Sequence, residues 1–142
     1  MSTTNLTDLA VSSTLAVTST LAVTGDSTFT GGIIANGGIK LPTQVMTADG
    51  AITIKSGLVL LTKAGALAAT LAAPTATTDD GKVLHILSTT AQAHTVTITA
   101  GLSGGGAGAD VGTFGGAIAD RVSLVAYGTN WYPLQNTNVT FG

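Results

Sequence analysis

The hydrophobic and polar positions of residues 9–44 repeat with a period of six. The segment divides without a gap into the hexads LAVSST, LAVTST, LAVTGD, STFTGG, IIANGG and IKLPTQ. Apolar residues stand mainly at the first and third hexad positions, and residues two apart on an extended chain share one face. Each hexad is therefore expected to form a short apolar strand edge followed by a polar or glycine-containing turn. The apolar positions are Leu9, Val11, Leu15, Val17, Leu21, Val23, Phe29, Ile33, Ile39 and Leu41.

Two arrangements would bury these apolar edges. In a single-chain left-handed β-helix with three hexads per coil, residues 9–44 would give two coils with both ends uncovered. Stable solenoids usually need at least three repeats. Alternatively, three chains lie side by side as a triangular β-prism and point their apolar residues at a common axis. Because the prism leaves no exposed strand edge, we favour a trimeric stem with these apolar positions as its interface.

Beyond the repeat, short alternating runs are separated by Gly, Asp, Asn and Ser turns. We expect strands at 51–55, 57–63, 66–72, 82–88, 94–100, 110–114, 121–127, 131–135 and 139–141. The Ala/Leu-rich run 66–72 also fits one or two helical turns, but Pro74 and the neighbouring strands favour a strand. Short strands at about ten-residue spacing are typical of a small sandwich or barrel.

The predicted fold is thus all-β with three parts. Residues 1–8 form a polar leader, residues 9–44 form the hexapeptide-repeat β-stem, and residues 50–142 form a small antiparallel β-sandwich or barrel. A turn around 47–50 separates the stem from the last part.

Charge is scarce along the chain. Asp, Glu, Lys and Arg make up 8% of the residues, glutamate is absent and Arg121 is the only arginine, whereas soluble domains average about 25%. Few charges leave a monomer poorly protected against association, which favours a chain that covers its surface in an oligomer or a larger assembly. A net charge of −2 with scattered lysines gives no basic footprint, so no nucleic-acid partner is expected.

Cysteines and long apolar runs are also absent. The chain therefore has neither a disulfide framework nor thiolate metal ligands. No run approaches the length of a membrane-spanning helix, and the first residues lack a positive segment followed by an apolar one. We expect no membrane partner and no secretory signal.

The two histidines are the only candidate metal ligands with a suggestive position. His85 and His94 flank a turn at 88–93, and in a hairpin they could face each other and bind an ion together with Asp79 or Asp80. In a trimer, one histidine per chain could also form a ring of three. Zinc sites need three or four ligands, so ordinary strand histidines are the favoured interpretation, and we expect no metal and no cofactor.

Catalytic motifs are missing. The glycine-rich residues 104–108 lack the Gly-Lys-Ser/Thr ending of a phosphate-binding loop. There is no nucleophile elbow and no acidic cluster of the glycosidase type. We expect the protein not to be an enzyme.

Trp131 and Tyr132 form the one bulky aromatic pair, with Tyr127 shortly before them. Flat aromatic faces suit sugar rings, so the pair is a candidate for glycan recognition. More often, such a pair contributes one ring to the core and one to the surface.

Several segments resemble one family of virion proteins. They are residues 61–67 (LTKAGAL), 71–75 (LAAPT), 79–82 (DDGK), 88–96 (STTAQAHTV), 113–116 (TFGG), 131–132 (WY) and 136–139 (NTNV). Over about residues 57–142 the chain is similar to the head-decoration proteins of tailed bacteriophages, also described as cement or head-fibre proteins. The hexads look like the β-structured shafts of phage fibres.

This resemblance implies a homotrimer on the outer capsid surface of a virion. Its partners would be copies of itself and the major capsid protein, and its role would be to clamp neighbouring capsomers or to project a weakly adhesive domain. The resemblance transfers no catalytic residue. A tail-fibre or spike appendage that binds a host-surface glycan is the alternative within the same group.

Overall fold

The structure, a computed structural model, describes residues 16–25, 27–103 and 110–142. The chain divides into two compact units, Met1–Gly38 and Ile39–Gly142. Ten strands lie in the second unit, and the described residues include no helix. The all-β prediction is therefore confirmed.

The hexads before Gly38 form no strand in their described residues. Leu9, Val11 and Leu15 lie outside the description. The other predicted interface residues are exposed in the single chain, from 44% for Val17 to 70% for Ile39. Their apolar surface is not buried within this chain, and the trimeric β-prism stays a prediction.

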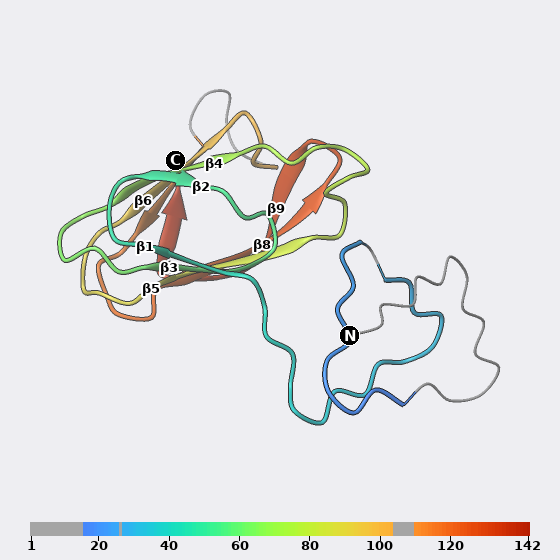
Figure 1. Ribbon diagram of the computed structural model, residues 1–142. Helices are drawn as coiled ribbons and strands as arrows, with labels where there is room; N and C mark the ends of the chain where they lie inside the picture. Colours follow the sequence, from blue (N-terminus) through green and yellow to red (C-terminus); the bar gives the residue numbers. More distant parts are fainter. Residues whose placement is uncertain (1–15, 26, 104–109) are drawn as a thin grey trace. The chain divides into compact units, whose positions relative to one another are not determined.

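Residues Ile39–Gly142 form two five-stranded sheets that face each other (Figure 1). Sheet A contains, in spatial order, β1 (Thr43–Met46), β3 (Gly57–Leu61), β5 (Val83–Ser88), β8 (Arg121–Tyr127) and β9 (Asn130–Thr137). Sheet B contains β10 (Val139–Phe141), β7 (Val111–Phe114), β6 (Thr95–Thr99), β4 (Ala68–Ala72) and β2 (Gly50–Ile52). The strand expected within 66–72 is confirmed.

The chain crosses from one sheet to the other after every strand from β1 to β5. Consequently β1, β3 and β5 are parallel neighbours in sheet A, and β2, β4 and β6 are parallel neighbours in sheet B. Each pair of consecutive strands makes one coil, and the coils stack. Strands β7 to β10 then complete the sheets by antiparallel pairing. The prediction of a purely antiparallel sandwich is wrong, because both sheets are mixed.

The same crossing corrects the expected hairpin at residues 88–93. Strand β5 belongs to sheet A and β6 to sheet B, so this segment connects the two sheets. His85 and His94 therefore do not face each other across a pair of strands.

Alternation along each strand decides which side chains fill the space between the sheets. In β5, Leu84 and Ile86 are almost fully buried, whereas His85 between them is exposed. Side chains in a strand point to opposite faces in turn, so one face of each sheet supplies the core. The largest fully buried side chains include Trp131, Phe114, Leu61, Leu71, Leu84, Ile86, Ile98 and Leu124.

The first coil depends on a close contact between two backbone segments. Gly57 begins β3 with a φ of 103°, a conformation that L side chains rarely adopt. A Cβ atom there would collide with the carbonyl oxygen of Pro42. That oxygen accepts a hydrogen bond from the N–H of Leu58 at 2.9 Å. Glycine at 57 therefore allows β1 to start directly after Pro42.

Candidate functional site

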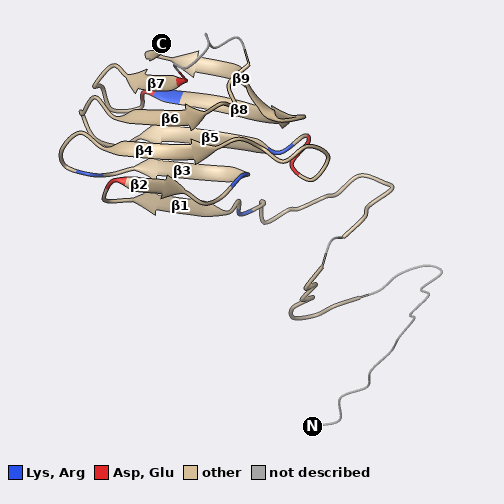
Figure 2. Cartoon of the chain, turned by 90° about the horizontal axis from the view of Figure 1, so that it is seen from above, with Lys and Arg blue, Asp and Glu red and all other residues tan. Residues whose placement is uncertain are grey.

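The few charged groups of the sheet domain serve its fold. Asp79 is 3% exposed, and its carboxylate pairs with Lys55 at 2.7 Å and Lys82 at 2.8 Å. It also accepts a hydrogen bond from the N–H of Thr75. Lys55 and Lys82, together with this N–H group, hold the pKa of the Asp79 carboxyl well below its usual range. Figure 2 shows that charged residues lie near strand ends and in loops.

The two histidines have separate surroundings. His94 is buried, its Nδ1 accepts a hydrogen bond from the N–H of Leu67 at 3.0 Å, and its Nε2 lies 2.9 Å from Oγ1 of Thr90. Burial and, secondarily, the charge of Lys63 lower its pKa. Both ring nitrogens of His94 are thus engaged inside the chain. His85 is exposed on sheet A, with Nδ1 2.8 Å from Oγ of Ser123.

The side chains of the predicted aromatic pair, Trp131 and Tyr132, lie on opposite faces of β9. Trp131 is fully buried, and its Nε1–H donates to the carbonyl oxygen of Ala72 at 3.0 Å. The interpretation of Trp131 as a surface platform is therefore wrong. Tyr132 is 37% exposed and lies instead beside Tyr127, which is 67% exposed, with ring centroids 6.5 Å apart and planes inclined by 56°. The sequence hinted at this pair only through the position of Tyr127 before a tight turn.

The outer face of sheet A carries several large apolar side chains. Its side chains alternate with the core residues, and the strand registers place them in rows across β1, β3, β5 and β8. One row reads Val45, Leu60, Leu87 and Arg121. By register and burial, the outer-facing positions of sheet A are Thr43, Val45, Leu58, Leu60, Val83, His85, Leu87, Arg121, Ser123, Val125, Tyr127, Asn130, Tyr132, Gln135 and Thr137.

Aliphatic groups lie on both sides of a largely polar middle row, in which His85 and Ser123 are neighbours. Leu58, Leu60, Val83, Leu87 and Val125 are all partly exposed on inner strands of the sheet. Arg121 stands at the start of β8, between Leu87 and Thr137 in its row. Contiguous exposed apolar surface of this kind usually marks a protein-interaction site.

The outer face of sheet B gives an internal comparison. Its registered rows consist mainly of threonine and alanine: one row reads Ala68, Thr95, Thr113 and Thr140, and another reads Ala51, Thr70, Thr97 and Val111. Threonine hydroxyls form hydrogen bonds with water, so this face suits solvent. The outer face of sheet A therefore carries more large aliphatic side chains than the outer face of sheet B.

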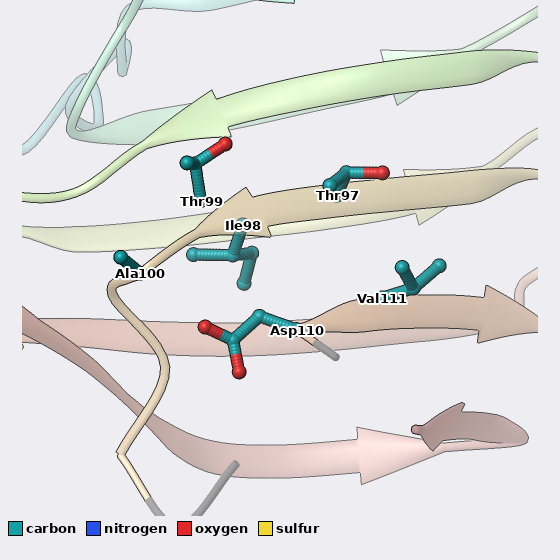
Figure 3. A pocket seen from close by; sticks show the side chains of 6 residues that line it. All are labelled: Thr97, Ile98, Thr99, Ala100, Asp110 and Val111. Carbon is teal, nitrogen blue, oxygen red and sulfur yellow. The ribbon is translucent and has the colours of Figure 1, made fainter. Parts of the chain in front are cut away.

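A pocket of about 290 Å³ opens at the end of β6 (Figure 3). Its lining consists of Thr97, Ile98, Thr99, Ala100, Asp110 and Val111. Oδ2 of Asp110 accepts hydrogen bonds from the N–H groups of Gly101 at 3.3 Å and Leu102 at 3.4 Å. The carboxylate thus holds the backbone that follows β6, and the pocket gives no argument for a particular ligand.

Within residues 16–25, 27–103 and 110–142, no three or more His, Cys, Asp or Glu side chains gather closely enough to hold a metal ion. The same residues include no helix with the length and hydropathy needed to cross a membrane.

Comparisons with models of protein families, with curated proteins and with solved structures found no match. The function is therefore argued from the surfaces described above.

Proposed function

We propose that this chain is a non-enzymatic structural protein of a tailed-bacteriophage virion, a homotrimer that decorates and stabilises the outer capsid surface. The exposure of the hexad residues carries this proposal. Leu21, Phe29 and Ile39 are each at least 64% exposed in the single chain. A repeated apolar edge that is exposed in the described residues of the single chain fits against other copies of the same edge.

Two further features support the proposal. Only 8% of the residues are charged, which suits a surface that is largely covered in an assembly. Residues 57–142 also resemble head-decoration proteins, as the sequence motifs indicate.

The proposed partners are the chain itself and the major capsid protein. Binding would rest on shape, apolar burial and backbone pairing between chains rather than on charge. Each trimer presents three copies of every contact, so individually weak contacts with neighbouring capsomers add up through effective concentration. The shell would resist internal pressure without any cofactor.

A mass measurement in solution tests the trimer. We expect three chains per particle at micromolar concentration for the full chain. Replacing Leu15 and Val17 together with Asp should yield monomers, because unpaired charges near a shared axis cost several kcal/mol. Thr14→Asp with Thr18→Asp, at polar hexad positions, is the matched control and should keep the trimer.

Cosedimentation with empty capsids then tests the location. The trimer should pellet with the shells, and the monomeric variant should bind at least tenfold more weakly because it loses avidity. A wild-type monomer, or a trimer that ignores capsids but binds tail structures, would refute the decoration role.

The tyrosine pair favours a second candidate, a fibre or spike appendage that binds a host-surface glycan. Tyr127 and Tyr132 are exposed, close and tilted, and aromatic faces suit the apolar face of a sugar ring. On a glycan array, Tyr127→Ala should abolish any signal, while Tyr127→Phe should largely retain it. Binding that is unchanged in Tyr127→Ala would remove this candidate.

A further inference from the structure

We propose that the outer face of sheet A is the self-association surface of the sheet domain, and that it binds two further copies of this chain around the trimer axis. This inference rests on the proposed trimer and assigns a second interface to it. The aliphatic row of the face, with Leu60 and Leu87 in neighbouring strands, would line that axis.

The small number of charged side chains on this face favours a partner surface that is also uncharged. Its residues include no carboxylate and no lysine, and its one permanently charged side chain, Arg121, stands at a strand end. A partner with a charged surface would lose solvation there without gaining ion pairs. A copy of this chain, with 8% charged residues and the same aliphatic face, meets the requirement.

The face also continues the exposed apolar positions of the repeat. Ile39 and Leu41 are 70% and 48% exposed, and both belong to the same unit as the sheets. Val45 follows at the same two-residue phase and is 56% exposed on β1. The apolar edge that is predicted to hold three chains together therefore leads along the chain directly into sheet A.

The area of the sheet A face is too small to hold a trimer together without the hexad repeat. Four strands about 4.8 Å apart, with about five residues of 3.3 Å each, cover roughly 300 Å² in projection. A stable interface needs about 800 Å² per partner. Sheet A alone falls short, whereas domains already held together by a stem associate at a high effective concentration. We therefore expect loss of the face to weaken the trimer and loss of the hexads to abolish it.

Single cysteines provide a direct test, because the chain has none of its own. Leu87→Cys lies in the central strand of sheet A, and Thr97→Cys lies in the central strand of sheet B as its matched control. In the full-chain trimer, a maleimide should modify Cys at 87 at least tenfold more slowly than Cys at 97. Dilution to monomers should abolish this difference.

A charge at the same position gives a second readout. Leu87→Asp should weaken trimer association at least tenfold while leaving the circular dichroism spectrum unchanged, and Thr97→Asp should have no effect on the mass.

A Cys at 87 that reacts as fast as one at 97 in a genuine trimer would overturn this inference and leave the proposed function standing. Protection at 87 that persists in the monomer would also overturn it, because the occupant would then be a segment of the same chain. A monomeric wild type would refute the proposed function itself.

Discussion

At the scale of single residues, His94 links the two sheets through its neutral form. Its Nδ1 accepts from the N–H of Leu67, so Nε2 carries the proton and donates to Thr90. The hydroxyl of Thr90 donates in turn to the carbonyl oxygen of Lys63 at 3.0 Å. A second proton on the ring would place two donors against each other at Nδ1. The buried network therefore requires a neutral imidazole.

This requirement predicts acid sensitivity in a defined pH range. Because the pKa of His94 is below 6.5 in the folded chain, the unfolded chain takes up the proton first. The stability contributed by His94 is present above pH 6.5 and is lost as pH falls from there toward the folded pKa. The free energy of unfolding should drop by up to about 1.4 kcal/mol per pH unit in this window.

Urea denaturation between pH 7.5 and 5.5 measures this slope. His94→Gln should be less stable at neutral pH but should show a flatter profile. Equal slopes for wild type and His94→Gln would contradict the assignment.

The sequence pattern predicted that strand residues alternate between buried and exposed positions, but it did not assign a function to the exposed ones. Trp131 and Tyr132 are adjacent in sequence, so strand alternation requires that they point to opposite faces. Which of them faces the core depends on the partner sheet, and sequence spacing alone does not specify it. The favoured interpretation, one ring in the core and one at the surface, agrees with the burial of Trp131 and the exposure of Tyr132. The hydrogen bond from Trp131 to Ala72 joins residues far apart in the chain, so the sequence did not show which ring is buried.

At the scale of elements, Gln44 closes the open end of the first coil. Its Nε2 donates to the carbonyl oxygen of Ala51 at 2.9 Å, and its Oε1 accepts from the N–H of Thr53 at 2.8 Å. One amide side chain thus joins β1 in sheet A to the end of β2 in sheet B. Both backbone groups would otherwise lack these partners at the end of the stack.

Gln44→Ala should therefore destabilise the domain by about 0.5–1 kcal/mol, because it removes exposed hydrogen bonds that water can replace. Gln44→Glu, which retains only the acceptor, should lie between alanine and wild type near neutral pH. Thermal unfolding followed by circular dichroism measures the order of the three. Thr43→Ala is the control on the same strand, because its side chain is exposed. A Gln44→Ala variant as stable as Thr43→Ala would show that this amide contributes nothing to the first coil.

The sequence predicted the strands well but not their partners. Alternation marks β3, β5, β6 and β8 because one face of each is buried, and this local property is visible in the letters. Parallel or antiparallel pairing depends on where the chain goes between strands. Strand β1 was missed because Pro42 and the repeat before it suggested the end of a stem.

At the scale of the whole molecule, apolar surface is distributed unevenly. The outer face of sheet B carries threonines, whereas the outer face of sheet A carries partly exposed aliphatic side chains. The apolar residues of the described hexads are exposed. The low charge content predicted that the chain associates with other chains. It did not predict which surface associates, because the assignment of Leu60 and Leu87 to an outer face requires knowledge of the sheet order.

The coil also sets a unit of growth. Leu58 lies beside His85 in sheet A, and Ala69 lies beside Val96 in sheet B, at the same separation along the chain. One further coil of this length would extend the domain by about 4.8 Å and leave Gln44 at one end and the antiparallel strands at the other. A partial coil would move every later strand into the opposite sheet. In evolution or in design, this domain can therefore be lengthened only by inserting complete coils.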